Sequence, residues 1–517
     1  MAFVLILLLA IAVVYLLNQY LFSYWSKRGI KQLEPSFFYG DGGDLIKFKK
    51  SMGEFFKDIY SKHKNERIVG VYISYKPVLV VTDPKLVQDI LIRDFTTFHD
   101  RPMPVDENKD PISGHLFNIG GQKWRDLRVK LSPTFTSGKI KAMYPIIKNV
   151  GKVLEDYLDE QVNKGVNVFE FRDLMARFNI NIISSVAFGI DNDCINEPKH
   201  FFRQMSAKIF DPNLMNGLRA LITLLAPTLF HKLNMRILDR DVEDFIFSVV
   251  KQTVEYREQK NFSRNDFMQL LIQLKNQGYV SVDKGEKDSE EMKNHSDTKS
   301  KLTLNEIIAQ AFVFFVAGFE TSSSTLLYCL FELARHKEIQ QKVQQEVDKV
   351  FKTSGPDGVT YDMLSELKYL ECVIDETLRK YPILPVHVRT ANRDYKIADS
   401  NIVIPKGASL WIPALGFHRD PDIYENPLEF KPERFLNSSN GDGKATGVFY
   451  TPFGDGPRNC IGMRLGKLTT KIGLSIIFSK FNLELNDKEM QDGELKFHPN
   501  QFVLTPSKLF NMKISRR

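Results

Sequence analysis

A glycine-rich loop around one cysteine constrains this chain most strongly. The run from Phe453 to Gly462 reads FGDGPRNCIG and holds three glycines and a proline around Cys460, directly before a predicted helix. Glycine permits backbone conformations and close approaches that a side chain would block, so the backbone can wrap tightly around the sulfur. Although an isolated loop cysteine is usually inert, amide groups in such a loop stabilise a thiolate and tune a bound metal. The loop therefore predicts a metal–thiolate site in which Arg458 can pair with an anionic cofactor group.

The remaining cysteines and the charge balance exclude several classes of protein. The 517 residues contain four cysteines with no CxxC pair, which argues against a disulfide scaffold or a structural zinc site. We expect Cys194, Cys329 and Cys372 to pack as small apolar side chains. The net charge of +7 comes from 70 basic and 63 acidic residues, without the basic clustering that nucleic-acid binding requires. We therefore expect no nucleic-acid partner, and an acidic protein or an anionic membrane instead.

The N-terminus predicts a membrane anchor. Residues 2–17 are uninterruptedly apolar and aromatic side chains continue to Trp25, so the stretch reaches the roughly 20 residues that cross a bilayer. We expect Tyr20, Tyr24 and Trp25 to lie at the membrane interface. Positive charges follow at once, as in Lys27, which places the rest of the chain on the cytosolic side. A cleaved signal peptide is the alternative, but no charged residues precede the stretch and no small residues mark a cleavage site.

The rest of the chain reads as one helix-rich domain. We expect residues 1–25 to be the anchor and residues 26–517 a single catalytic domain. A β-hairpin is predicted over 68–81, helical patterns dominate from Pro84 onward, and short strands precede a last helix near 465–481. A charged stretch over 277–300 predicts a solvated loop. The predicted fold class is mainly α (α+β), with a minor β-sheet and one N-terminal transmembrane helix.

One helix is predicted to lie at the centre of the domain. Thr303 and Glu306 form a capping box, and the residues behind them are apolar on nearly every face. Within this helix, the sequence AGFETS places Gly318, Glu320 and Thr321 in succession. One interpretation is a kink in which Thr321 bonds back to the preceding turn. The other is a loosened helix that leaves room for a ligand, with Thr321 and Glu320 organising proton delivery.

The cysteine loop resembles the haem-binding signature of the cytochrome P450 family. Four further motifs resemble those of the family in the same order along the whole chain, so the resemblance implies both fold and chemistry. It implies haem b with an axial thiolate from Cys460 as the iron ligand, and a monooxygenase activity, because a thiolate favours O–O cleavage. The matching loop residues are Phe453, Gly454, Gly456, Arg458, Cys460 and Gly462.

The other motifs imply roles for further residues. Trp124 and Arg128 of the motif WRDLR lie four apart on one helical face, and the resemblance assigns them to a haem propionate. Arg389 of HVR is implied as another propionate contact, beside Phe453 and Arg458 of the cysteine loop.

The remaining motifs imply proton delivery and support for the cysteine loop. The resemblance implies that Thr321 and Glu320 are the catalytic pair. Glu376 and Arg379 of ETLR, with Arg434 of PERF, are implied as a buried structural network. One departure is Lys337 after His336, where many relatives have a proline, and this should alter little beyond local stability.

The pattern from Phe314 to Leu330 and the spacing to Tyr381 are most similar to microsomal, xenobiotic-metabolising insect members of the family. That similarity implies insertion of one oxygen atom from O2 into lipophilic toxins or insecticides. It also implies electrons from NADPH through NADPH-cytochrome reductase, cytochrome b5 as a further donor, and a location on the cytosolic face of the endoplasmic reticulum membrane. The alternative is oxidation of an endogenous hormone, steroid or fatty acid. More remote alternatives are a haem-thiolate isomerase and a non-enzymatic haem protein.

Two surfaces are also predicted. The resemblance implies a substrate cavity lined by Pro111–Phe117, Met205–Leu233, Phe312–Thr321, Leu384–Val388 and Phe502–Leu504. The apolar stretch Leu218–Phe230 either packs on the core or dips into the bilayer. A basic face for docking an acidic electron donor is predicted from Lys123, Arg125, Lys130, Lys139, Lys141, Lys467 and Lys471.

Overall fold

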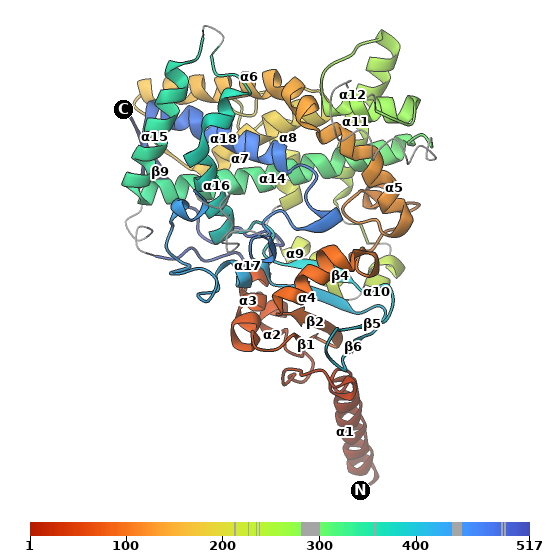
Figure 1. Ribbon diagram of the computed structural model, residues 1–517. Helices are drawn as coiled ribbons and strands as arrows, with labels where there is room; N and C mark the ends of the chain where they lie inside the picture. The colour runs from red at the N-terminus through yellow and green to blue at the C-terminus, as the bar shows by residue number, and fades with distance from the viewer. Residues whose placement is uncertain are drawn as a thin grey trace.

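The computed structural model describes residues 1–210, 214–225, 227–233, 235–236, 238–280, 300–355, 358–436, 447–486, 490 and 493–517. A large helical part adjoins a smaller part that contains the main sheet, and helix α1 extends away from the sheet side (Figure 1). The longer helices are α1 (Ala2–Leu21), α3 (Met52–His63), α5 (Gly121–Leu131), α6 (Ser137–Asn163), α7 (Phe171–Ile183), α8 (Phe201–Phe210), α9 (Leu214–Leu225), α11 (Arg240–Lys260), α12 (Phe267–Asn276), α14 (Leu304–Arg335), α15 (Lys337–Lys352), α16 (Lys368–Lys380) and α18 (Met463–Lys480). The shorter helices are α2 (Gly43–Ile46), α4 (Pro84–Gln88), α10 (Pro227–Lys232) and α17 (Ala414–His418).

The strands form three small sheets. The largest has the order β1-β2-β7-β4, with β1 and β2 antiparallel, β2 and β7 parallel, and β4 and β7 antiparallel. The first pair confirms the predicted hairpin, and β6 and β7 confirm the short strands predicted at 402–404 and 409–412. The strands are β1 (Ile68–Ile73), β2 (Lys76–Val81), β3 (Val168–Phe169), β4 (His387–Thr390), β5 (Tyr395–Lys396), β6 (Val403–Ile404), β7 (Ser409–Ile412), β8 (Phe481–Leu485) and β9 (Met512–Arg516).

Helix α14 is the centre of the helical part, as predicted. Thr303 and Glu306 make the capping box in both directions, and most of the side chains behind them are buried. The helix is continuous across Gly318, where a Cβ atom would lie 2.5 Å from Cδ1 of Ile183 on α7. Gly318 therefore allows two helices to approach closely, and the predicted loosening of the helix is wrong.

The anchor helix is attached closely to the domain. In the described part of the chain, α1 and α14 are the helices long and apolar enough to cross a membrane, but α14 is mostly buried whereas α1 is almost entirely exposed. Directly after α1, Phe22 and Trp25 are buried against the β1–β2 hairpin. A Cβ atom on Gly70 of β1 would lie 2.5 Å from the Trp25 ring.

The interface prediction is therefore wrong for Trp25, whereas Tyr20 is exposed. The predicted domain boundary at residue 25 falls within a segment that packs on the domain.

Two other predicted segments have different outcomes. Most of the charged loop at 277–300 lies outside the described residues. The stretch 218–230 forms parts of α9 and α10, in which Phe230 is buried and Leu218 and Leu229 are exposed. Core packing therefore accounts for Phe230, and insertion of the stretch into the bilayer stays a prediction.

Candidate active site at the cysteine loop

The cysteine loop is held in a tight conformation by its glycines. Gly454 and Gly456 have φ angles of +73° and +68°, which side chains rarely adopt. A Cβ atom on Gly456 would lie 1.9 Å from the carbonyl oxygen of Leu91, so the loop could not approach that segment with any other residue. The Cys460 amide donates to the carbonyl of Phe453 at 2.8 Å, which closes the loop just before α18.

Cys460 opens into a cavity of about 260 Å³ between the loop and α14. Burial raises the pKa of its thiol, whereas a hydrogen bond from the Gly462 amide and the charges of Arg128 and Arg101 lower that pKa. The cavity wall is mostly apolar, and it includes Leu116, Phe117, Val313, Phe314, Ala317, Thr321, Ile383 and Leu384.

Four arginines line the cavity: Arg101, Arg128, Arg389 and Arg458. None of them forms a salt bridge within the described part of the chain. The Nε and Nη1 atoms of Arg458 and the Nε atom of Arg389 are buried without hydrogen-bond partners. Burial lowers the pKa of Arg458 to about 9 and that of Arg389 to about 10. Because buried cations are normally paired, this cluster fits an anionic ligand, as the two propionates of haem require.

The sequence-predicted cofactor residues meet at this cavity. Trp124 and Arg128 on α5, Arg389 on β4, and Phe453, Arg458 and Cys460 of the loop all line it. The Arg458 guanidinium lies 4.6 Å from the Trp124 ring centre. Arg128 donates to the carbonyl and side-chain oxygens of Asn459 at 3.1 and 2.8 Å. The residues that converge here fit a haem with an axial thiolate.

Sequence reasoning missed Arg101, which belongs to no motif. Its Nη1 donates to the Phe117 carbonyl at 2.9 Å and its guanidinium lies 4.0 Å from the Phe117 ring centre. Burial and the charges of Arg389, Arg458 and Arg128 lower its pKa well below the usual value. Arg101 lies in an irregular segment, and nothing in the sequence around it separates it from a surface arginine.

Thr321 and Glu320 have different surroundings. The Thr321 hydroxyl lines the cavity and donates to the Ala317 carbonyl at 2.6 Å, which is the back-bonding that one interpretation predicted. Glu320 does not line the cavity. Its carboxyl is buried beside the charges of Arg172 on α7 and Arg203 on α8, and burial raises its pKa while those charges lower it.

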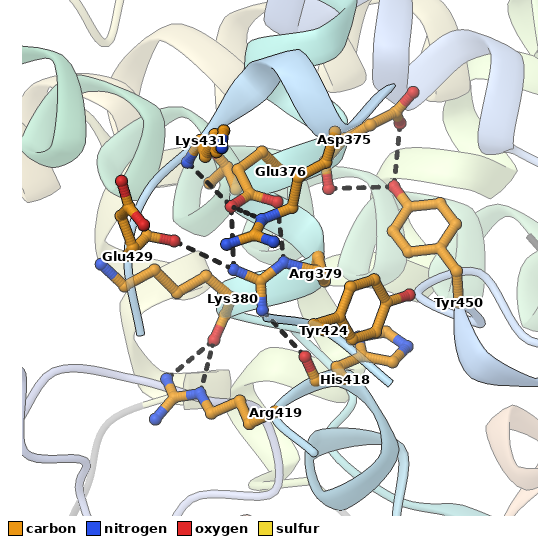
Figure 2. A network of polar contacts seen from close by, with 12 residues as sticks. Asp375, Glu376, Arg379, Lys380, His418, Arg419, Tyr424, Glu429, Lys431 and Tyr450 are labelled. Atoms are coloured by element: carbon orange, nitrogen blue, oxygen red, sulfur yellow. Dashed lines mark hydrogen bonds and ion pairs between the residues drawn. The ribbon is translucent and has the colours of Figure 1, made fainter. Parts of the chain in front are cut away.

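The predicted supporting network is present behind the loop (Figure 2). Glu376 accepts from Nε and Nη2 of Arg379 at 2.7 and 2.8 Å, and from Arg434 at 3.3 Å. Arg379 also donates to the carbonyl of His418 at 2.8 Å. Both Glu376 and Arg379 are fully buried.

Two buried histidines connect this network to the cysteine loop. The His418 ring accepts a hydrogen bond from the Thr451 amide at 2.9 Å, and the His387 ring contacts the Thr451 carbonyl at 2.9 Å. Burial lowers the pKa of His387 to about 4 and that of His418 to about 3. Both rings are therefore neutral where they hold the start of the loop.

The predicted substrate surfaces are confirmed in part. Residues of Pro111–Phe117, Phe312–Thr321 and Leu384–Val388 line the cavity, whereas Phe502–Leu504 and the described residues of Met205–Leu233 do not. An apolar wall that was not predicted comes from Ile182 and Ile183 at the end of α7 and from Val186 in the short helix η6 (Ser184–Phe188).

The predicted basic face is largely neutralised within the chain. Lys467 and Lys471 pair with Glu371 at 3.5 and 2.9 Å, and the Lys471 side chain is only 10% exposed. Lys123 pairs with Glu107 and Lys141 with Asp362. The prediction is wrong for Lys471. Arg125 remains exposed, and so does Arg464 on α18, and neither forms a salt bridge within the described residues.

These features define a haem-thiolate monooxygenase, and comparison with known proteins agrees. The cytochrome P450 family profile matches residues 33–513, and the chain belongs to that family. It binds haem b with a thiolate ligand and is a monooxygenase.

Its relatives include insect members of the family. The chain is 40% identical to cytochrome P450 6a2 of Drosophila melanogaster, over 93% of each chain. It is 39% identical to cytochrome P450 6A1 of Musca domestica, over 94% of this chain and 92% of the relative. Cytochrome P450 6d1 of Musca domestica is 35% identical over 98% of both.

Proposed function

We propose that this monooxygenase oxidises lipophilic xenobiotics such as insecticides, using electrons from NADPH that a reductase delivers. The observation that supports this proposal is the apolar cavity between Cys460 and α14, whose wall offers phenyl and aliphatic side chains to a substrate. An apolar wall selects for lipophilicity and shape rather than for one hydroxyl or amine pattern. It also accommodates an endogenous steroid or fatty acid, which a turnover screen of both classes would separate.

In the proposed mechanism Cys460 is the iron ligand. Trp124 and the arginines Arg128, Arg389 and Arg458 hold the haem carboxylates. The haem supplies the metal centre for oxygen activation, and the chain supplies orientation, exclusion of water and protons. The Thr321 hydroxyl is the proton donor that faces the cavity, once it turns away from the Ala317 carbonyl. Glu320 does not line the cavity, and burial raises the pKa of its carboxyl, which makes it a candidate to pass a proton along α14.

The first test is the carbon monoxide difference spectrum of the reduced protein, with Cys460→Ser as the control. A strongly red-shifted Soret band that is lost in the control is the expected result. An ordinary haem band would mean that Cys460 is not the thiolate ligand. The absence of any haem band would reject the site as a whole.

A second test addresses proton delivery. Thr321→Ala should consume NADPH at a normal rate while releasing peroxide in place of oxidised product, because the cavity loses its hydroxyl donor. Thr321→Ser keeps the hydroxyl and should remain coupled. Equal coupling in Thr321→Ala and the wild type would remove Thr321 from the mechanism.

Docking of the electron donor is proposed to depend on Arg125 and Arg464, which flank the cysteine loop on α5 and α18. Reversing both charges should raise the KM for NADPH-cytochrome reductase and weaken its salt dependence. Lys62→Glu on the exposed side of α3 is the control. If the double variant and the control behave alike, docking lies elsewhere. The same assay with cytochrome b5 tests that protein as a second donor.

We also propose an endoplasmic reticulum location with the domain on the cytosolic face. Residues 261–263 read Asn-Phe-Ser, an N-glycosylation acceptor, and Asn261 is exposed at the end of α11. On the cytosolic face this site stays unmodified. A form directed into the lumen by an added signal peptide should gain a glycan at Asn261, and a glycan on the natural form would reverse the proposed topology.

A further inference from the structure

Asp100 contacts the parts of the chain that carry three of the cavity arginines, Arg101, Arg128 and Arg389. It directly precedes Arg101, in the segment between two short helices, η3 (Phe95–Thr97) and η4 (Pro111–Gly114). Its carboxylate accepts a hydrogen bond from the Gly121 amide at 2.7 Å, and it lies 2.6 Å from Nδ1 of His99. The side chain is 29% exposed, so it is shielded but not sealed from water.

The Asp100 carboxylate caps helix α5 from outside that helix. Gly120 is the N-cap residue and provides no side-chain cap. Its missing Cβ gives Asp100 room, since a Cβ atom there would lie 2.5 Å from Oδ1 of Asp100. A carboxylate at a helix N-terminus satisfies free amides and interacts favourably with the helix dipole. The cap fixes the start of the helix that carries Trp124 and Arg128 into the cavity.

The backbone of Asp100 reaches a second element of the site. Its carbonyl accepts from the Thr390 amide at 2.9 Å, in an isolated antiparallel bridge. Thr390 ends β4 and directly follows Arg389. One residue therefore ties together the segment of Arg101, the helix of Arg128 and the strand of Arg389.

The Asp100 charge also opposes the arginine cluster. Its negative charge raises the pKa of Arg458, against burial and the charges of Arg389 and Arg128. Four guanidinium groups against this carboxylate leave an excess of three positive charges. Two haem propionates and one cysteine thiolate carry three negative charges, so these groups balance when the iron–porphyrin core itself is neutral, as it is with ferrous iron.

We propose that Asp100 is a positioning residue for the haem carboxylates. Its side chain fixes the start of α5, its carbonyl holds the end of β4, and its negative charge offsets part of the positive charge of the arginine cluster. This proposal rests on the haem-binding roles proposed above for the arginines. A wild-type protein without a thiolate-ligated haem spectrum would reject those roles before any variant is compared.

The test compares three variants of the full-length holoprotein. Asp100→Ala removes both the cap and the charge, whereas Asp100→Asn keeps an oxygen acceptor and removes the charge. Ser51→Ala is the matched control, because Ser51 caps α3 with its side chain and α3 does not line the cavity. The readouts are thermal unfolding, the rate of haem transfer to excess apomyoglobin, and the midpoint potential of the iron.

Ser51→Ala and Asp100→Ala should both lower the unfolding temperature. Asp100→Ala should in addition speed haem transfer by roughly tenfold to a hundredfold, as expected when an outer partner of a metal-site residue is lost. Both Asp100 variants should raise the midpoint potential, because loss of a nearby negative charge favours the reduced state. Haem transfer from Asp100→Ala at the rate of Ser51→Ala would overturn the positioning role. An unchanged potential in Asp100→Asn would overturn the charge balance.

Discussion

Two buried arginine clusters adjoin the cysteine loop, and they differ in how completely they are paired. Behind the loop, Arg379 donates to Glu376 through two nitrogens and to two backbone carbonyls, those of His418 and Glu429 (Figure 2). At the cavity, Arg458 contacts the Ile119 carbonyl through one nitrogen and leaves the other two without partners. A buried arginine with complete pairing makes the fold sensitive to the loss of its partner, and one with incomplete pairing fits an anionic ligand.

The largest expected effect comes from breaking the paired cluster. Glu376→Ala leaves Arg379 buried without its counter-charge, which should destabilise the fold by about 3–5 kcal/mol. Denaturant unfolding measures this change. Glu484→Ala on β8 removes the partner of Lys337 from a pair whose side chains are 70% and 53% exposed and should cost less than about 1 kcal/mol. Similar losses in both variants would remove the distinction between the two clusters.

At the cavity cluster, which contains Arg458, we expect a smaller effect on the free energy of unfolding and a larger effect on haem affinity. Arg458→Met removes a buried charge that forms no salt bridge within the described residues and leaves two of its nitrogens without partners, so the apoprotein should be as stable as the wild type or more stable. Haem affinity should fall by roughly 10- to 100-fold, because about 1.5–3 kcal/mol of charged hydrogen bonding is lost. Haem transfer and apoprotein unfolding are the measurements. An apoprotein destabilised as strongly as Glu376→Ala would contradict the assignment of Arg458 to a ligand.

The effect of the histidines that join the two clusters is the smallest over a single pH unit, and it accumulates as the pH is lowered further. His387 and His418 have folded-state pKa values of about 4 and about 3, below the unfolded value of 6.5. Between pH 6.5 and about 4 the unfolded chain binds protons that the folded chain does not. The free energy of unfolding therefore decreases as the pH is lowered, by up to about 1.4 kcal/mol per pH unit for each histidine. Denaturant unfolding at several pH values measures the slope. His418→Gln should flatten it, and an unchanged slope would mean that other groups dominate.

The sequence predicted the local features well. The Cys460 loop, the capping box at Thr303 and the β1–β2 hairpin are encoded by neighbouring residues, and all are confirmed. The sequence did not show which side chains far apart along the chain would pair. Lys471 was predicted to face a partner protein, but Glu371, far away in the sequence, neutralises it.

For the same reason, the sequence did not predict that Asp100 and Arg101 belong to the site. They join the site through contacts with α5, β4 and Phe117, and no spacing in the sequence announces such contacts. Gly318 carried a signal that was interpreted incorrectly, since a glycine in a helix marks close packing as well as flexibility.

The burial of Trp25 bears on how shortened forms of this protein are made. A truncation at residue 25 would remove the membrane helix, and with it an indole ring that fills the notch above Gly70 and a backbone amide that the Tyr72 hydroxyl contacts at 3.1 Å. The hairpin would then expose apolar surface where the aromatic side chains of Phe22 and Trp25 had covered it. A soluble form that begins just before Phe22 keeps that cover, and should be purified with less aggregation than one that begins after Trp25.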